Sequence, residues 1–289
     1  MSTNNSLYSI ENIQYTLKSK NFCIITLDID ILNNLENNGF AIVENVIDEH
    51  ECEKLTNSLD EMESEYRKLE KNEFITDAQI QIPNVHLLQP DIFLDKINLP
   101  IVMDTAKKIL GSPFILSNFN ASRSGPKGGG RIHIDSRIPI SNFFDTTHLV
   151  SMICLDDFTD KNGATIVWPN SHKSGKDPKT EKDIEIENGK FASAKRGSVI
   201  FTLGQTWHDV GPNIDGNRRW GIISYYTRWW IKPTYDFTKC GPEIYNKLNN
   251  EQKELFGFTS MPPFDAFKRY RTVNPVNDLP KDYEDVLSF

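Results

Sequence analysis

The chain has 289 residues, of which 38% are hydrophobic and 25% are charged, an ordinary composition for a globular protein. Its formal net charge of −8 at pH 7 argues against a protein that binds nucleic acid through a broad basic face. No apolar run reaches the roughly 18–20 residues needed to cross a bilayer, and the polar start lacks a signal-peptide pattern. We therefore expect a cytoplasmic protein that contacts neither nucleic acid nor membrane, as a monomer or a homodimer.

The first third of the chain predicts helices around one short strand. A helix is expected at residues 29–35 and a strand at residues 40–43. Asp48, with Glu51 three residues later, has the form of a capping box, which opens a second helix. A third helix is expected at about residues 100–110, with a proline in its first turn and a glycine at its end.

Strands dominate the middle of the chain. Residues 79–86 predict a polar loop or an irregular strand, whereas residues 114–122 predict a regular one. Asn118, Asn120 and Ser122 alternate on one face of that strand. This polar face points either to solvent or into a wet barrel interior.

Later strands are expected at five further places, with turn signals at Asn162-Gly163 and Gly216. They cover residues 131–136, 147–155 and 164–168, residues 197–203 extending to His208, and residues 219–226. A helix is expected at about residues 241–256.

Helices followed by a run of strands suggest a helical layer over an antiparallel barrel or jelly roll. We find no repeat and no linker between compact halves. The expected organisation is one domain over residues 1–289. It consists of a helical layer at about 29–111, a core at about 112–232, and a C-terminal helix and tail at 233–289.

One histidine and one acid lie two positions apart within residues 131–136. Alternating side chains of a strand would place His133 and Asp135 on one face. One imidazole and one carboxylate form two thirds of the 2-His-1-carboxylate triad that binds non-haem Fe(II). His208, on a later strand, is the candidate for the third ligand.

Arg219 follows His208 after ten intervening residues. A turn near Gly216 would let His208 end one strand and Arg219 begin the antiparallel return, so that both side chains face one cavity. Iron held by three protein ligands leaves positions for a chelating 2-oxo acid and for oxygen. The far carboxylate of 2-oxoglutarate then needs a planar cation, which arginine supplies better than lysine.

Three other histidines have alternative roles. His148 lies in a hydrophobic strand and either packs in the core or lines the cavity. His172 lies in a Ser/Lys/Gly-rich loop and is interpreted as structural or solvated, and His86 as a weak candidate for substrate contact.

Several stretches together resemble the phytanoyl-CoA dioxygenase (PhyH) family of Fe(II)/2-oxoglutarate oxygenases, over roughly residues 30–230. The similar stretches are residues 35–43, His133-Ile134-Asp135, residues 162–172 with Asn170 in place of a glycine, residues 197–201, Trp207-His208, residues 211–213, and Arg219 at the His-x10-Arg position.

The resemblance implies a double-stranded β-helix (jelly-roll, cupin-like) core and a dioxygenase that uses Fe(II), 2-oxoglutarate and O2, with ascorbate as a possible reductant. It implies that His133, Asp135 and His208 are the catalytic metal ligands, and that Arg219 forms the salt bridge to 2-oxoglutarate. Asn120, on the strand before the metal motif, is our candidate for a second contact. The family often has Ser or Thr two residues after the distal histidine, where this chain has Val210. A different hydroxyl would then serve, or the cosubstrate would bind differently.

The related halogenases replace the carboxylate ligand by a small residue, so Asp135 argues against halogenation. Hydroxylation is the expected outcome, while desaturation, epoxidation and cyclisation would use the same ligands. Arg137 is a candidate for an anionic substrate group, and Phe143 and Trp229 for an apolar wall. We expect a small, partly polar metabolite or natural-product intermediate as the substrate.

Two alternatives belong to other functional classes. One is a metal-binding jelly-roll protein without oxygenase activity. The other is an iron dioxygenase that works without 2-oxoglutarate, in which Arg219 would serve the substrate.

Overall fold

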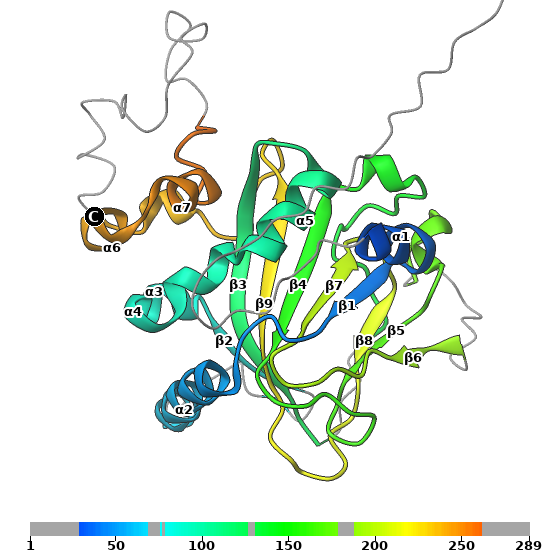
Figure 1. Ribbon diagram of the computed structural model, residues 1–289, viewed down its shortest axis with the longest axis horizontal. Coiled ribbons are helices and arrows are strands. Elements are labelled where there is room, and N and C mark those ends of the chain that lie inside the picture. Colours follow the sequence, from blue (N-terminus) through cyan, green and yellow to red (C-terminus); the bar gives the residue numbers. More distant parts are fainter. Residues whose placement is uncertain (1–28, 69–75, 77–78, 127–130, 179–187, 262–289) are drawn as a thin grey trace, which may run out of the picture.

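Two antiparallel sheets form the core of the protein (Figure 1). The computed structural model describes residues 29–68, 76, 79–126, 131–178 and 188–261. The larger sheet has the strand order β1-β7-β4-β9-β3-β2, and the smaller one the order β6-β5-β8. The strands of the larger sheet are β1 (Phe40–Val43), β2 (Gln79–Pro83), β3 (Phe114–Ser124), β4 (His148–Cys154), β7 (Val199–Leu203) and β9 (Trp220–Arg228). The strands of the smaller sheet are β5 (Thr165–Val167), β6 (Lys190–Phe191) and β8 (His208–Val210).

Helices flank this core. Figure 1 shows α5 running across β3, β9 and β4, with α3 and α4 on the same side of the sheet. The helices are α1 (Ile29–Asn38), α2 (Glu49–Tyr66), α3 (Val85–Leu88), α4 (Pro90–Phe93), α5 (Pro100–Leu110), α6 (Pro242–Lys247) and α7 (Asn250–Leu255). Short 3-10 turns are η1 (Leu94–Asn98), η2 (Phe143–Asp145), η3 (Ser171–Lys173) and η5 (Phe237–Lys239). The predicted fold, a mainly antiparallel jelly roll with flanking helices, is confirmed.

Local signals explain most of the helix ends. The side chain of Asp48 accepts a 2.8 Å hydrogen bond from the N–H of Glu51, so the predicted cap opens α2. The helix predicted at 241–256 is instead two helices, because the chain is extended at Leu248 and Asn249 begins α7 with a capping box.

One face of the larger sheet packs against the helices. Phe119, Ile153 and Ile222 point to this side and join the helices in one hydrophobic core. Tyr226 also points to this side, where its hydroxyl donates a 2.6 Å hydrogen bond to the carbonyl of Ile97. The residues that alternate with these therefore face the interior between the two sheets.

The interior face carries the polar row that the sequence left open. Asn118, Asn120 and Ser122 of β3 pair with the interior residues Tyr225, Ile223 and Gly221 of β9. Asn118, Ile223 and Tyr225 are partly accessible, although β9 lies in the middle of the sheet. The row thus lies on the face of the larger sheet that points toward the smaller sheet.

Two strand predictions are wrong in detail. Residues 131–136 form no regular strand, because only His133 bridges to His208 before the N–H groups of Asp135 and Ser136 both donate to the carbonyl of Gly204. The strand expected to run from residue 197 to His208 is broken after Leu203, and His208 begins β8 in the other sheet. The ambiguous segment at residues 79–86 contains β2, which pairs with β3.

Within the part of the chain that the structure describes, no helix combines the length and the apolar character required to cross a membrane.

Candidate metal centre

Three side chains converge at the open end of the two sheets. The Nε2 atom of His133 lies 3.8 Å from one carboxylate oxygen of Asp135, and Nε2 of His208 lies 3.4 Å from the other. One ligand atom from each residue lies within 4.8 Å of the others. Two imidazole nitrogens and one carboxylate oxygen at this spacing are the donor set of a non-haem iron site.

The backbone holds these ligands from both sheets. His133 exchanges two hydrogen bonds with His208, at 3.0 and 3.1 Å, and so adds to the edge of the smaller sheet. Asp135 donates its N–H to the carbonyl of Gly204 at 2.7 Å, at the end of β7 in the larger sheet. The segment from His133 to Asp135 therefore crosses from one sheet to the other.

Both imidazoles are oriented for coordination through Nε2. The Nδ1 atom of His133 lies 2.8 Å from the carbonyl oxygen of Arg131, and Nδ1 of His208 lies 3.0 Å from that of Thr206. A carbonyl only accepts, so each Nδ1 carries the proton and each Nε2 keeps its lone pair. Burial and the neighbouring His208 lower the pKa of His133, while Asp135 opposes this shift. The net lowering of the His133 pKa favours the neutral imidazole that a metal requires.

Arg219 is a buried cation without an acidic partner. Its side chain is 2% exposed, and its guanidinium lies 3.8 Å over the ring of Phe158 and donates to the Thr165 hydroxyl at 3.2 Å. Its Nε has no hydrogen-bond partner, and among the described residues no carboxylate lies within ion-pair distance. Burial lowers the pKa of Arg219 to about 10, so it is still charged at neutral pH. A buried, unpaired guanidinium is a site that an incoming carboxylate would stabilise.

The register connects this cation to the metal ligands. Thr165 pairs with Val210, and Val167 pairs with His208, so both pairs face the same side of the smaller sheet. Thr165, which contacts Arg219, is thus two residues, or about 7 Å, along the sheet from the level of His208. That separation is of the order of the length of a five-carbon diacid, and the residues present fit iron and 2-oxoglutarate together.

One predicted path to this arrangement is wrong. Arg219 does not return on a strand beside that of His208, because β8 pairs with β5 in the smaller sheet and β9 pairs with β3 and β4 in the larger. The link runs through the smaller sheet instead, because Arg219 donates to Thr165 of β5, the strand that pairs with β8. Arg218 points away from it, as expected, and binds Asp156 and Asp60 at 3.2 and 3.0 Å.

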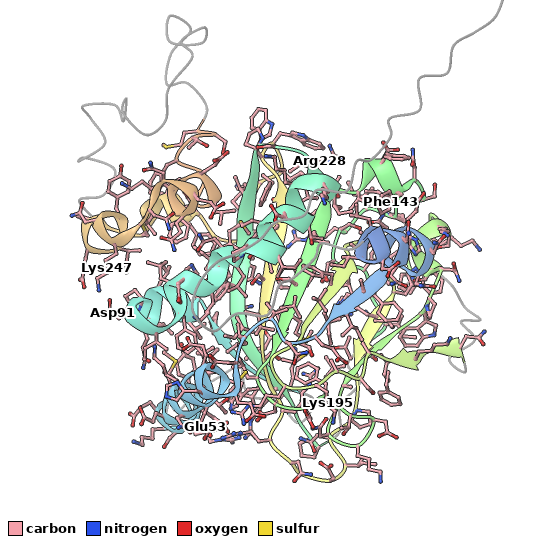
Figure 2. The ribbon with its side chains drawn as sticks, in the orientation of Figure 1. Glu53, Asp91, Phe143, Lys195, Arg228 and Lys247 are labelled. Atoms are coloured by element: carbon pink, nitrogen blue, oxygen red, sulfur yellow. The ribbon has the colours of Figure 1, made fainter. Side chains whose placement is uncertain are left out.

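The remaining predicted residues lie at different depths. Asn120 is 8% exposed on the interior face, and its side-chain oxygen accepts from the N–H of Asn84 at 3.3 Å. Arg137 is exposed with a left-handed φ of 59°, and Trp229 is 47% exposed. Phe143 packs partly buried against the helical core, near the same edge of the molecule as Arg228 in Figure 2.

The other three histidines considered in the sequence lie in different parts of the fold. His172 is buried and lies 2.9 Å from the carbonyl of Glu36, a structural role. His86 is fully buried on the helical side, among the rings of Phe119, Phe237 and Phe256. His148 begins β4 on the interior face.

Thr165 was not among the site residues predicted from the sequence. It lies opposite Val210 and supplies a hydroxyl on the face where the family often has one two residues after the distal histidine. The alternation of residues 164–168 could have indicated its direction, but only the pairing of β5 with β8 places it opposite Val210.

Comparisons with known proteins agree with this geometry. The sequence profile of the phytanoyl-CoA dioxygenase (PhyH) family matches residues 35–220. The dioxygenase af480 of Aspergillus fumigatus is 28% identical over 167 residues, which cover 55% of this chain and 53% of the fungal protein. The match therefore spans about half the length of that relative.

Two solved structures share the fold. One is HygX from Streptomyces hygroscopicus with nickel and 2-oxoglutarate bound, with a TM-score of 0.60 at 12% identity, covering 72% of this chain and 89% of that one. The other is SnoN, a non-haem α-ketoglutarate-dependent epimerase from nogalamycin biosynthesis, with a TM-score of 0.56 at 18% identity, covering 71% and 85%.

Proposed function

Because this chain belongs to the phytanoyl-CoA dioxygenase family, we propose that it is a non-haem Fe(II)- and 2-oxoglutarate-dependent dioxygenase. It oxidises an unactivated C–H bond of a small metabolite or natural-product intermediate, with hydroxylation as the simplest outcome. One observation carries the proposal. The three convergent side chains and the unpaired guanidinium of Arg219 face one interior. Thr165, which accepts a hydrogen bond from Arg219, lies two residues, or about 7 Å, along the smaller sheet from the level of His208.

The ligands would hold the metal on one side only. His133, Asp135 and His208 would bind Fe(II) through Nε2, a carboxylate oxygen and Nε2. Bound iron and 2-oxoglutarate would supply the activation of O2, so that substrate C–H, O2 and 2-oxoglutarate become C–OH, succinate and CO2. Asp135 fills the position that a halide would need, so oxygenation is favoured over halogenation.

Arg219 would orient the cosubstrate. Its guanidinium would bind the far carboxylate of 2-oxoglutarate, with the Thr165 hydroxyl beside it as a second hydrogen-bonding group. The ring of Phe158 and the thioether of Met152, each 3.8 Å from the guanidinium, line this end of the interior. A carboxylate bound there gains from the low dielectric, which strengthens its attraction to the cation.

The test needs no substrate. Fe(II) and 2-oxoglutarate are added anaerobically to the purified chain, and the weak visible charge-transfer band of the chelate is recorded. We expect the band in the wild type, its loss in Asp135→Ala, and a much higher 2-oxoglutarate requirement in Arg219→Ala. Arg218→Ala is the matched control, because this neighbouring arginine forms ion pairs outside the interior.

Other outcomes would favour the alternatives. Iron bound by the wild type without the band, at any 2-oxoglutarate concentration, would contradict the proposal. Oxygen consumption that then persists without 2-oxoglutarate would indicate a cosubstrate-independent iron dioxygenase, and no oxygen consumption would indicate a silent metal-binding jelly roll.

A further inference from the structure

We propose that His148 and Tyr225 form a substrate-positioning pair beside the metal centre, and that the pair selects a substrate with a neutral hydrogen-bonding group next to the carbon that is oxidised. The chemical class is an uncharged hydroxyl or amide compound. The inference rests on the proposed function and names the substrate class of that same site.

His148 is linked to a metal ligand through one residue. The N–H of Gly204 donates to the carbonyl of His148 at 2.8 Å, and the carbonyl of Gly204 accepts from the N–H of Asp135 at 2.7 Å. The three backbones therefore lie side by side as neighbouring strands would. A Cβ on Gly204 would lie 2.4 Å from Cβ of His148, so the absence of a side chain there lets the two backbones approach closely.

Tyr225 lies on the same interior face as His148. In the ladder of β4 and β9, His148 pairs with Thr227 and Val150 pairs with Tyr225. His148 and Tyr225 are therefore diagonal neighbours, whose Cα atoms are about 7–8 Å apart in such a ladder, a distance that long side chains can span. Asn118 lies beside Tyr225 on the other flanking strand.

Polar atoms on this wall lack partners among the described residues. Nδ1 of His148 is bonded to the Thr147 hydroxyl at 2.8 Å, which leaves Nε2 free. The side-chain oxygens of Asn118 and Thr227, which flank Tyr225, are buried without a hydrogen-bond partner among the described residues. Unsatisfied polar groups that line a cavity are stabilised by a ligand that bonds to them.

The charges around the pair favour a neutral ligand. Burial lowers the pKa of His148, which Asp135 opposes and Arg137 reinforces, and burial followed by Asp135 raises the pKa of Tyr225. Both side chains are thus uncharged at neutral pH. Neither side chain therefore offers a charge to a ligand, and the cationic Arg137 is exposed. Neutral donors and acceptors remain as the means of recognition.

The test uses the full chain loaded anaerobically with Fe(II) and 2-oxoglutarate. Four probes are added in turn, namely glucose, an N-acetyl amino acid amide, glutamate and palmitoyl-CoA. Binding is followed by the change in the charge-transfer band and, separately, by saturation-transfer NMR. We expect a neutral probe to bind best, and Tyr225→Phe and His148→Leu each to raise its Kd about tenfold, as loss of one buried hydrogen bond does.

Two comparisons separate positioning from stability. Tyr226→Phe removes a hydroxyl from the adjacent tyrosine on the helical face, and it should lower stability without changing the Kd of the neutral probe. His148→Gln keeps a donor and should recover part of the affinity that His148→Leu loses. The affinity for 2-oxoglutarate should be the same in Tyr225→Phe as in the wild type.

Several results would contradict the proposed role of His148 and Tyr225. These are a preference for glutamate or palmitoyl-CoA, no binding of either neutral probe, or equal neutral-probe affinity in the wild type and both variants. If the wild type gives no band with Fe(II) and 2-oxoglutarate, the proposed function fails first. A normal band together with any of the three results above would contradict the positioning role of His148 and Tyr225 and leave the proposed function intact.

Discussion

The backbone N–H of Asp135 donates to the carbonyl oxygen of Gly204 at 2.7 Å, which fixes this proposed metal ligand to the end of β7. Gly204 also bonds to His148, and a Cβ added to it would meet the Cβ of His148 at 2.4 Å. A residue that carries no side chain thus determines where the proposed metal ligand Asp135 lies.

Gly204→Ala should therefore weaken metal binding. Relief of the clash must move the backbone of Gly204, and with it Asp135, so we expect about a 10–100-fold rise in the Kd for Fe(II), as for other disturbed ligand supports. Anaerobic Fe(II) titration measures it. Gly216→Ala is the control, because a Cβ there meets nothing within 4 Å, although its φ of 76° strains the turn. Equal Fe(II) affinity in Gly204→Ala and the wild type would contradict the prediction.

Thr165→Val should weaken the binding of 2-oxoglutarate. The change removes the hydroxyl that accepts from Arg219 at 3.2 Å but keeps the shape of the side chain. We expect the Kd for 2-oxoglutarate to rise about 10–150-fold, the range for one lost hydrogen bond to a charged group. The titration follows the charge-transfer band.

A hydroxyl at position 210 should restore part of the 2-oxoglutarate affinity that Thr165→Val loses. Val210 pairs directly with Thr165 on the same face, so Val210→Ser would place a hydroxyl beside the lost one. The double variant should bind 2-oxoglutarate more tightly than Thr165→Val alone. If Thr165→Val binds 2-oxoglutarate like the wild type, the hydroxyl has no part in the site.

His86 should make the protein less stable in acid. Burial among three aromatic rings lowers its pKa from 6.5 to about 3 in the folded state, and neither ring nitrogen has a partner in the described chain. The unfolded state therefore takes up a proton below about pH 6.5, while the folded state stays neutral. Stability from this group is complete above pH 6.5 and falls by up to about 1.4 kcal/mol per pH unit between pH 6.5 and 3.

Urea unfolding at pH 7.5 and pH 5.5 measures this effect. His86→Leu should lose a large part of the difference in unfolding free energy between the two pH values. Some pH dependence should persist, because the pKa values of His133, His148 and His172 are also lowered by burial. An unchanged difference in His86→Leu would show that the unfolding of this protein is not linked to His86.

Arg228→Ala should loosen the segment around η2. The guanidinium donates to the carbonyls of Thr146 and Phe144 at 2.8 and 2.9 Å and so holds this segment at the end of β9 (Figure 2). We expect faster amide hydrogen exchange at residues 143–147, with the Fe(II) affinity retained. Lys247→Ala, which removes a surface ion pair with Asp91, is the control and should leave exchange in this segment unchanged.

Local signals in the sequence predicted the elements better than their partners. The cap at Asp48, the helix at residues 100–110 and the strand at residues 40–43 were all visible in short patterns. Nothing local indicates that β1 pairs with β7, some 160 residues later, or that β2 pairs with β3. Such pairings depend on how distant strands bury their faces together.

The same limit applies to the metal centre. The three ligand types and their order along the chain were predicted, and the structure brings them together. The strand arrangement that brings them together was not predicted, because His133 forms a single bridge and Arg219 comes from the opposite sheet. Thr165 and Tyr225 were missed because their roles depend on register across strands, which a one-dimensional pattern does not contain.

The crossing of the segment from His133 to Asp135 between the two sheets has a mechanical consequence. A metal ion bound there would be a cross-link, with His133 and His208 on one sheet and Asp135 tied to the other. Binding energy would then resist separation of the sheets. At a metal concentration 100 times the Kd, it would add about 2.7 kcal/mol to the folded state. Iron would in that case stabilise the packing of the two sheets as well as serve as the reactive centre.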